Sequence, residues 1–519
     1  ITEYLLERPR VVRQSANERG FHVFYYLING VDEITKMKLN IHESYSDYDY
    51  LARSSEPPDS SFCKNMWIQL QEAFEAIGFD LPTRERIAST LSGILELGNV
   101  LFVPSDTNDD GADLTTPVAM AQAAKTLQIS PSSLQTAIMT SRKVMRGSTI
   151  VKRLSAEQCN DYRDATAKII YGKMFTWLVA KVSELSNQNF SESKLKICML
   201  DIFGFENFDN NGFEQMCINV ANEQLQFFFN DHIFKKEIEE YYREGLDSHV
   251  VNITYKDNTS LLALFTGNPL SVFILMNEES KLRTSTVKTL VQKMKSHLGT
   301  RPELHMLPDG FAVNHYAGKV IYDADGMINK NRDDVPDSIL LVIAASECPI
   351  LQQAFAESNA EVKALATGFS QTRKQSVRQR LSIKGKKKSK AKQTVAAQFS
   401  ASLKSLILKM TVCQPHFLRC IKPNRIAQPS DFDNDYVLDQ LRYTGVLETV
   451  RIRREGFAAR LKFAEFLAHY GVLAFAYTAK PPANVASCTA VLKEVKVCKL
   501  VVVLLLLLLV VVVLWCCCS

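Results

Sequence analysis

The segment Lys194–Gln215, KLKICMLDIFGFENFDNNGFEQ, joins an apolar run to a group of acidic residues and glycines. An apolar run that ends in Asp201 is typical of a strand that carries an aspartate to the edge of a parallel sheet, where nucleoside triphosphatases hold magnesium. Gly204 follows, and a glycine lets a backbone N–H approach a phosphate closely. Glu206 could then position an attacking water. An aspartate after a strand is also a common turn former, so this pattern alone leaves both interpretations open.

The residues after this segment predict one long helix. Between Gly212 and Gly245 the chain contains neither proline nor glycine, and apolar residues recur at intervals of three to five. A helix of this length would extend roughly 45 Å at about 1.5 Å per residue. Such a rod could carry a movement far from its origin, but a long core helix fits the periodicity equally well. The apolar positions are Phe213, Met216, Val220, Leu225, Phe228, Phe229, Ile233 and Ile238.

Further helices and short strands predict an α/β fold. Ser155–Ser186 opens with Ser155 and Gln158 at the spacing of a capping box and continues with a broad apolar face. A second helical pattern, Thr83–Val100, should end at Gly98. Besides Lys194–Leu200, strands are expected at Phe311–Tyr316 and Lys319–Asp323, joined as a hairpin through Ala317 and Gly318, and at His249–Tyr255.

Positive charge is concentrated in one part of the chain. Between Val362 and Ser430 there are sixteen lysines and arginines and no acidic residue. The whole chain has a net charge of +5, so the residues outside this stretch have a net charge of 5 − 16 = −11. Within it, Arg373–Gln393 has no apolar periodicity and predicts a mobile surface loop. By charge alone nucleic acid, an anionic membrane and an acidic protein are equally good partners. The loop lacks aromatic residues, which weakens the nucleic-acid interpretation.

Cysteine and histidine usage excludes several classes of protein. Twelve cysteines occur without CxxC pairs, and nine histidines form no HxxxH pair. This pattern argues against a zinc site or a disulfide framework and favours a reducing intracellular compartment. A hydrophobic content of 46% over 519 residues is enough for an extensive core, which excludes a disordered protein.

Four motifs together resemble the myosin motor domain. The hexapeptide DIFGFE and the following NEQLQFFFNDHIFKKEIEEY resemble its second switch and relay helix. Three more segments stand in the family's order, and the resemblance covers about Ile1 to Leu473. It implies a P-loop NTPase-type fold that is mainly helical around an incomplete central sheet, and an actin-based motor with ATP and Mg²⁺ as cofactors. Within the family the chain looks more like the unconventional myosins, especially those whose tails carry FERM domains. The three segments are VRQSANERGFHVFYYLI (Val12–Ile28), QPHFLRCIKPN (Gln414–Asn424) and QLRYTGVLETVRIRREGF (Gln440–Phe457).

The resemblance also implies roles for the residues of the hexapeptide. Asp201 would act on Mg²⁺ through water, the Gly204 amide would bind the γ-phosphate, and Glu206 would pair with an arginine of the first switch. The relay helix, Phe213–Arg243, would transmit the rearrangement toward Gln440–Arg453 and the start of the converter near Gly456.

Two segments resemble the family's actin-binding elements. Leu270–Leu298, with Lys281 and Arg283, resembles the helix-loop-helix of the lower subdomain, although an ordinary amphipathic helix pair is the alternative. Asn277 replaces the usual aspartate and KLRTST lacks the usual apolar-proline tip, which leaves the strength of this contact open. The basic loop resembles the second surface loop, whose lysines would attract acidic residues of actin over a distance. These are Lys386, Lys387, Lys388 and Lys390.

Ser148 occupies a further position of interest. MRGSTIVKRL resembles the actin-facing loop in which one position is either acidic or phosphorylatable, and Ser148 is that position here. Lys143, Arg146, Lys152 and Arg153 surround it, so a phosphate would enter a basic setting. A plain exposed serine is the alternative.

The resemblance divides the chain into five parts. They are a partial motor with an upper 50K remnant, switch II, relay helix and lower 50K (1–372), the basic loop (373–393), the last motor helices with an SH1-type helix (394–455), the start of the converter (456–475) and an unrelated tail (476–519). Within the tail, Leu500–Leu514 contains only leucine and valine. This stretch is either the translation of a simple repeat or a membrane anchor.

Two expected motifs are missing from the sequence. No GxxxxGK[ST] phosphate loop occurs, and no first switch with its arginine is found; both would precede Ile1 in the family. We therefore expect a fragment cut at both ends, beginning within a helix at ITEYLLERPR, with an exposed strand edge and no useful ATP hydrolysis of its own. The expected partner is the actin filament in the cytoplasm, within a myosin complex, with no nucleic-acid partner and an unassigned cargo. The alternatives are a non-catalytic actin-binding fragment and a tail-anchored membrane protein.

Overall fold

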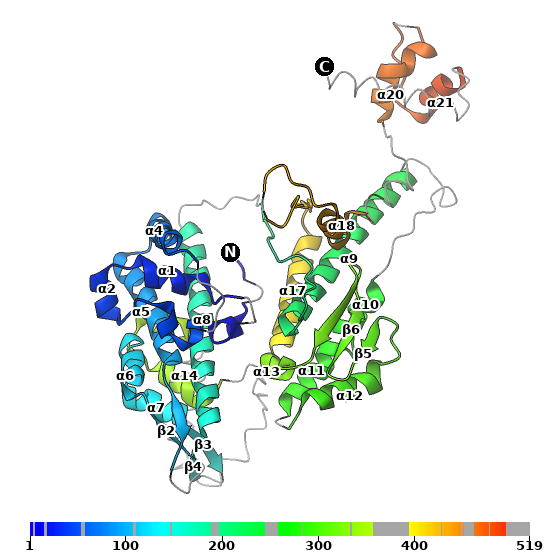
Figure 1. Cartoon of the computed structure of the whole chain (residues 1–519). Helices are drawn as coiled ribbons and strands as arrows, with labels where there is room; N and C mark the ends of the chain where they lie inside the picture. Colours follow the sequence, from blue (N-terminus) through cyan, green and yellow to red (C-terminus); the bar gives the residue numbers. More distant parts are fainter. Residues whose placement is uncertain are drawn as a thin grey trace, which may run out of the picture. The chain divides into compact units, whose positions relative to one another are not determined.

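The computed structural model divides the chain into two compact units, one of residues 1–227 and 258–419 and one of residues 228–257 and 420–519 (Figure 1). The first unit contains two separate hydrophobic cores. The described residues are 1–3, 6–14, 18–52, 58–106, 111–145, 148–187, 197–243, 258–282, 284–332, 335–356, 394–426, 428–447, 450, 461–476 and 478–494.

The first core is helical and packs around α5 (Leu81–Gly98) and α8 (Ala156–Asn187). Asp80 caps α5 by accepting a hydrogen bond from the Thr83 amide, and the helix ends at Gly98 as the sequence predicts. The capping box at the start of α8 is confirmed, because Ser155 and Gln158 exchange hydrogen bonds of 3.3 Å. The surrounding elements are η1 (Arg8–Val11), α1 (His22–Gly30), α2 (Glu33–Leu39), η2 (Tyr45–Asp47), α3 (Asp49–Ala52), α4 (Ser60–Ile77), α6 (Pro117–Thr126), α7 (Pro131–Met139), α14 (Asp337–Ala344) and α15 (Pro349–Ala354).

Two small antiparallel hairpins extend from this core. The first pairs β1 (Phe102–Pro104) with β2 (Ala112–Leu114), and the second pairs β3 (Thr140–Met145) with β4 (Ser148–Arg153). In the second hairpin Met145 lies opposite Ser148, and the part of MRGSTIVKRL from Ser148 to Arg153 forms the returning strand.

The second core lies between several helices and a three-stranded antiparallel sheet. Its strands are β5 (Leu304–Met306), β6 (Gly310–Asn314) and β7 (Lys319–Asp323), with β6 in the centre. The predicted hairpin is confirmed, and Gly318 adopts a φ of 146° in its turn. The helices are the first part of α9 (Phe213–Arg243), α10 (Thr259–Thr266), α11 (Val272–Lys281), α12 (Val287–Leu298), α13 (Met327–Arg332) and α17 (Val395–Thr411).

Among its described residues, the second unit holds the remaining part of α9 and four short elements. These are α18 (Asn434–Tyr443), α20 (Phe463–Tyr470), η4 (Gly471–Leu473) and α21 (Val485–Glu494). Cys488 and Val491 of α21 are buried. The long helix predicted after Gly212 is confirmed, since α9 runs without a break from Phe213 to Arg243.

Two local predictions are wrong. Residues 197–200 of the predicted strand Lys194–Leu200 form no strand, and the side chains of Ile197 and Met199 are fully exposed. A strand is stable only beside a hydrogen-bonding neighbour, and no described strand lies along these residues. Near the start, Leu6 and Glu7 are not helical, and Arg8–Val11 forms a short 3-10 helix with Pro9 in its first turn.

Several predictions concern residues that the structure does not describe. Residues 194–196, the predicted strand His249–Tyr255 and the basic loop Arg373–Gln393 lie outside the described ranges. The described sheets are small and antiparallel, so the central parallel sheet stays a prediction. Within the described ranges no helix has both the length and the apolar character needed to cross a bilayer, and Leu500–Leu514 lies outside them.

Candidate functional site

The hexapeptide Asp201–Glu206 has no regular secondary structure and is separated from α9 by residues 207–212. Asp201 and Gly204 are exposed, and Glu206 is half-buried. A Cβ atom placed on Gly204 would meet no atom within 4 Å, so the space beside this glycine is open. The segment therefore offers the exposed carboxylate of Asp201, the accessible peptide of Gly204 and, two residues later, the partly enclosed carboxylate of Glu206.

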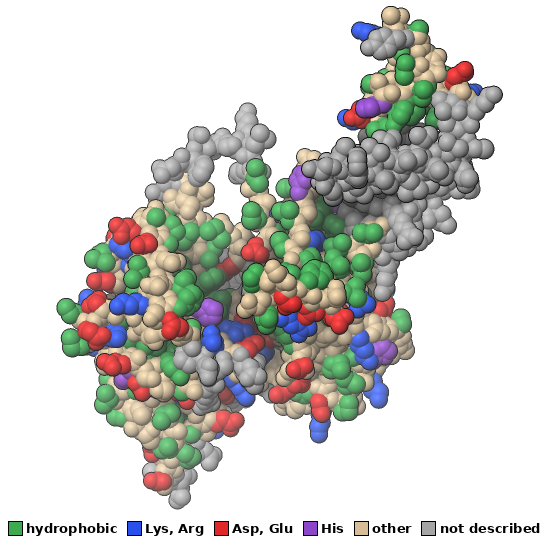
Figure 2. Space-filling view, turned by 45° about the horizontal axis from the view of Figure 1, so that its top comes forward, with side chains coloured by type: hydrophobic (Ala, Val, Ile, Leu, Met, Phe, Trp, Pro, Cys, Tyr) green, Lys and Arg blue, Asp and Glu red, His purple; other side chains and the backbone are tan. Residues whose placement is uncertain are grey.

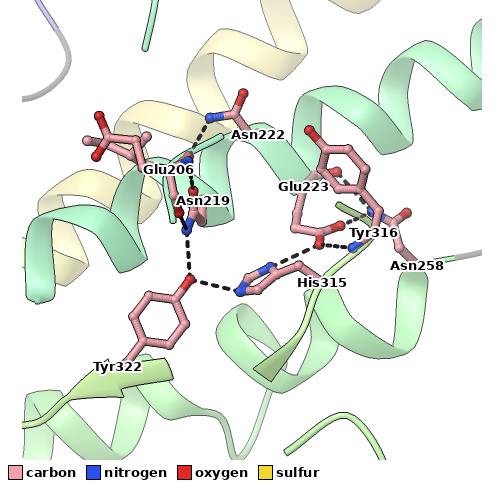
Figure 3. Close-up of polar contacts among 9 residues, drawn as sticks. Glu206, Asn219, Asn222, Glu223, Asn258, His315, Tyr316 and Tyr322 are labelled. Carbon is pink, nitrogen blue, oxygen red and sulfur yellow. Dashed lines mark hydrogen bonds and ion pairs between the residues drawn. The ribbon is translucent and has the colours of Figure 1, made fainter. Parts of the chain in front are cut away.

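Two asparagines of α9 hold the backbone of this hexapeptide (Figure 3). Asn219 Oδ1 accepts from the Glu206 N–H at 2.8 Å, and Asn219 Nδ2 donates to the Glu206 carbonyl at 2.7 Å. Asn222 Nδ2 donates to the Phe203 carbonyl at 3.1 Å. The hexapeptide and the long helix are thus joined by three hydrogen bonds to backbone groups, so a displacement of one is felt by the other.

The stretch between Glu206 and α9 is attached to β7. Asn211 donates from Nδ2 to the Ile321 carbonyl at 3.1 Å, and its own carbonyl accepts from the Asp323 N–H at 2.9 Å. The Gly212 N–H donates to Gln215 Oε1 at 3.1 Å, which satisfies one of the free amides at the start of α9. The hexapeptide is therefore held between a helix and the edge of a sheet.

The Glu206 carboxylate has an incomplete set of partners. Its Oε2 atom is inaccessible to solvent and has no hydrogen-bond partner among the described residues. Burial raises the pKa of Glu206, although a hydrogen bond with Gln215 opposes that rise. A buried acceptor without a donor is costly, so this oxygen fits a site that a further cationic donor completes.

A buried polar cluster continues from Asn219 into the sheet (Figure 3). Asn219 Nδ2 donates to Tyr322 Oη at 2.9 Å, Tyr322 Oη lies 2.8 Å from His315 Nε2, and His315 Nδ1 lies 3.0 Å from Glu223 Oε1. The Tyr322, His315 and Glu223 side chains are all buried. The Tyr316 amide and Asn258 Nδ2 donate to the Glu223 carboxylate at 2.9 and 2.6 Å. Each member of the cluster makes at least one hydrogen bond, although Asn258 Oδ1 is buried without a partner among the described residues.

Sequence reasoning missed these polar residues, although a signal was present. Asn219, Glu223 and Gln226 recur at helical spacing and are buried, on the same face of α9 as Met216 and Val220. Polar residues at the core positions of an amphipathic helix predict a buried hydrogen-bond network. The partners in the β6–β7 hairpin give no comparable signal in the sequence.

The predicted helix-loop-helix is present as α11 and α12. Lys281 is exposed at the end of α11, and Arg283 lies outside the described residues, as do Lys386, Lys387, Lys388 and Lys390. Buried Glu279 accepts from Thr289 Oγ1 at 2.8 Å and from Lys293 Nζ at 3.3 Å, which fixes the two helices to each other. Burial raises the pKa of Glu279, but the nearby Ser285 hydroxyl and the hydrogen bonds from Thr289 and Lys293 outweigh burial and lower the pKa overall.

Asn277 contacts Thr394, the residue that follows the basic loop. Its Oδ1 accepts from Asn331 Nδ2 of α13 at 3.1 Å and from the Thr394 hydroxyl, and Thr394 is the N-cap of α17. The amide at this position, where the family usually has an aspartate, therefore joins α11, α13 and the start of α17.

Ser148 is the first residue of β4, and its side chain lies outside the described residues. Of the four basic residues around it, Arg153 already donates to Asp113 Oδ1 and to the Ala112 carbonyl, both at 2.7 Å. Lys152 is exposed.

In the face shown in Figure 2, Lys and Arg side chains lie among Asp and Glu side chains. Among the described residues no group of three or more His, Cys, Asp and Glu side chains is placed to hold a metal ion directly. The role of Asp201 toward Mg²⁺ through water stays a prediction.

Comparison with known proteins places this geometry in one family. The family model for the myosin head (motor domain) matches residues 1–501. The chain belongs to the myosin motor-domain family. It is 37% identical to Myosin-IIIb of Mus musculus over 96% of the chain, 37% identical to Myosin-IIIa of Homo sapiens over 95%, and 35% identical to Myosin-2 of Arabidopsis thaliana over 95%.

The chain spans 40%, 32% and 39% of the lengths of these three relatives. Membership of the family is confirmed, as is a mostly helical motor fold with small sheets. The relatives carry the names of several myosin groups at similar identity, so the FERM-tailed subclass stays a prediction.

Proposed function

We propose that this myosin chain is the nucleotide-sensing and filament-binding part of an actin-based motor driven by ATP hydrolysis. The observation that carries the proposal is the attachment of the hexapeptide to α9 through Asn219 and Asn222. A loop that detects nucleotide can drive a movement only if a rigid element follows it. Three hydrogen bonds and an unbroken helix of 31 residues meet that requirement.

The residues of the hexapeptide take separate roles. Bound Mg²⁺ and ATP would supply the γ-phosphate that is detected and the cation that neutralises its charge. Asp201 would hold the metal through water, and the open side of Gly204 would leave its amide accessible to the phosphate. Glu206 would pair through its unpartnered Oε2 with an arginine of the first switch.

α9 would act as the relay helix, passing a displacement of the hexapeptide toward Gln440–Arg453 and the converter within 456–475. The other proposed parts are the partial motor 1–372, the basic loop 373–393, the last motor helices 394–455 and the tail 476–519. Such a motor would work in the cytoplasm on the actin cytoskeleton, as part of a myosin complex.

Actin binding is assigned to the α11–α12 pair and the basic loop. Lys281 and Arg283 would contact the filament, while Lys386, Lys387, Lys388 and Lys390 would attract its acidic residues. Phosphorylation of Ser148 would add a dianion beside Lys152 and tune this association. Because the loop lacks aromatic side chains for stacking bases, an acidic protein fits it better than nucleic acid does.

A steady-state ATPase assay with and without filamentous actin tests the proposal. The 519 residues contain no GxxxxGK[ST] motif, so we expect no actin-stimulated turnover from this chain alone and clear stimulation from the full-length parent protein. Actin-stimulated turnover by the chain alone would contradict the expectation that these 519 residues cannot hydrolyse ATP usefully. Absence of turnover from the parent would overturn the motor proposal itself.

A second candidate function is non-catalytic binding of actin. The observation in its favour is the hydrogen-bonded joint of Asn277, Asn331 and Thr394, which sets α11 beside the start of α17 without any group of the hexapeptide. Cosedimentation of the chain with actin separates the two candidates. Binding that ATP leaves unchanged supports this second function, and release by ATP supports the motor.

A further inference from the structure

The hydrogen bonds between Glu206 and Glu223 have a definite direction. Asn219 Oδ1 must face the Glu206 N–H, and Nδ2 must face the Glu206 carbonyl. In the reversed amide, Nδ2–H would face the N–H donor and Oδ1 would face the carbonyl acceptor, so neither hydrogen bond could form. One N–H of Nδ2 is therefore committed to Glu206, and the other donates to Tyr322 Oη. The backbone of the hexapeptide thus determines how the Asn219 amide is oriented.

Tyr322 passes this direction on to His315. Its oxygen accepts from Asn219, so its own O–H donates to His315 Nε2 at 2.8 Å. Burial raises the pKa of the Tyr322 phenol, which keeps this proton in place. His315 Nε2 is therefore an acceptor, and the ring proton sits on Nδ1.

The Nδ1–H of His315 donates to Glu223 Oε1 at 3.0 Å. Both oxygens of that carboxylate are occupied, Oε1 also by the Tyr316 N–H and Oε2 by Asn258 Nδ2. The Glu223 carboxylate therefore accepts three hydrogen bonds, which supply the partners that its burial requires. The chain of donors runs from the hexapeptide to Glu223, and His315 is its central link (Figure 3).

The imidazole ring also touches the hexapeptide directly. Phe205 meets it edge to face, with ring centroids 5.3 Å apart, and Phe265 stacks on it with centroids 5.7 Å apart. Rotation of the ring would break these contacts together with both hydrogen bonds. His315 therefore constrains the hexapeptide by two routes, through the Phe205 ring and through Tyr322 and Asn219.

We propose that His315, as the neutral Nδ1–H tautomer, is a positioning residue that holds the Glu206 peptide against α9. It acts through Tyr322 and Asn219 and touches no reacting atom. The role of His315 in the motor rests on the proposed function: there, His315 sets how readily the hexapeptide leaves α9 when the nucleotide changes. The tautomer and the protection of the Glu206 amide are properties of the chain without nucleotide.

The first test is the tautomer. The full 519-residue chain is labelled with ¹⁵N in its nine histidine rings, and the signals of His315 are identified by their loss in His315→Gln. We expect a protonated Nδ1 and an unprotonated Nε2. In Tyr322→Phe, Nδ1 should stay protonated because Glu223 still accepts its proton, while the Nε2 signal should shift because it loses the donated hydrogen bond. An Nε2–H tautomer in the wild type, or an unchanged Nε2 signal in Tyr322→Phe, overturns the proposal.

The second test is amide hydrogen exchange in peptides that contain Glu206. Tyr322→Phe should raise exchange there about tenfold, equivalent to roughly 1.4 kcal/mol, while peptides of α8 keep their protection. Tyr48→Phe is the matched control, because it removes an equally buried hydroxyl that accepts from the His42 N–H at 2.8 Å in the first core. An equal rise at Glu206 in both variants, or none in Tyr322→Phe, contradicts a positioning role.

A conservative variant separates positioning from packing. The amide of His315→Gln offers one acceptor and one donor, so it should keep exchange at Glu206 within about twofold of wild type. Loss of protection in this variant as large as in Tyr322→Phe would contradict the assigned donor and acceptor roles. All these measurements are made without nucleotide, so their failure leaves the ATPase result standing, and a failed ATPase assay leaves them standing.

Discussion

The long helices α8 and α9 are almost equal in length, at 32 and 31 residues, but they use their buried polar groups differently. On α8, Arg163 donates to the carbonyls of Gly98 and Val100, where α5 ends, and pairs with Asp164. On α9, Asn219 donates to and accepts from the peptide of Glu206. One helix satisfies the end of another helix, and the other holds a loop.

This difference separates a structural role from a functional one. The carbonyls at the end of a helix need donors in any state of the protein, so the partners of Arg163 can stay constant. A loop held by side-chain amides can be released at a cost of a few hydrogen bonds. The two helices are similar in length and burial, so these properties do not show which helix carries a movement. The groups that the buried polar side chains of each helix bind do show it.

The largest expected effect belongs to Arg163→Ala. It removes a buried guanidinium, leaves two carbonyls without their donor and takes the cationic partner from Asp164, which keeps only the hydrogen bond from Tyr50, so the first core should lose about 3–5 kcal/mol of stability. Denaturant unfolding measures the loss, and exchange at Glu206 should stay unchanged. Lys181→Met on the same helix breaks an exposed pair with Glu184 and should change stability by less than about 0.5 kcal/mol. A similar loss in both variants would remove the contrast drawn here.

Asn219→Ala should have a smaller but more local effect. Two hydrogen bonds to Glu206 and one to Tyr322 disappear, and at about 1 kcal/mol each the local opening of the hexapeptide should become easier by roughly 2–3 kcal/mol. Hydrogen exchange at residues 201–208 reports this change. Asn222→Ala removes a single bond to Phe203 and should show about a third of it. If Asn219→Ala loosens α8 equally, the two helices do not differ in the way described.

The smallest effect is expected from Glu206→Gln and depends on pH. Burial raises the pKa of the folded Glu206 above its unfolded value near 4.5, so the folded state is penalised once the group ionises. Wild-type stability should therefore fall as pH rises from about 4.5 through the folded pKa, and the glutamine variant should lack this fall. At neutral pH we expect the variant to be more stable by under about 1 kcal/mol, measured by urea unfolding at a series of pH values. A variant that is less stable at neutral pH would contradict an unsatisfied carboxylate.

Local patterns predicted the long elements well. Ser155 and Gly98 mark helix ends in the sequence, and the structure has helices with those ends. The hairpin of β6 and β7 followed from alternating apolar residues and Gly318. These features depend on groups within a few residues of one another, which is why sequence alone could find them.

The sequence by itself determined the helices, the hairpin, the concentrated basic segment and, through its motifs, the myosin motor family. Tertiary structure decided the rest of the site. Asn219 meets Tyr322 across 103 residues, and Glu223 meets His315 across 92, and no local pattern encodes which polar groups become partners at such separations. Tertiary structure also decided that residues 197–200 are not a strand, since an apolar run becomes one only where a neighbour supplies its backbone hydrogen bonds.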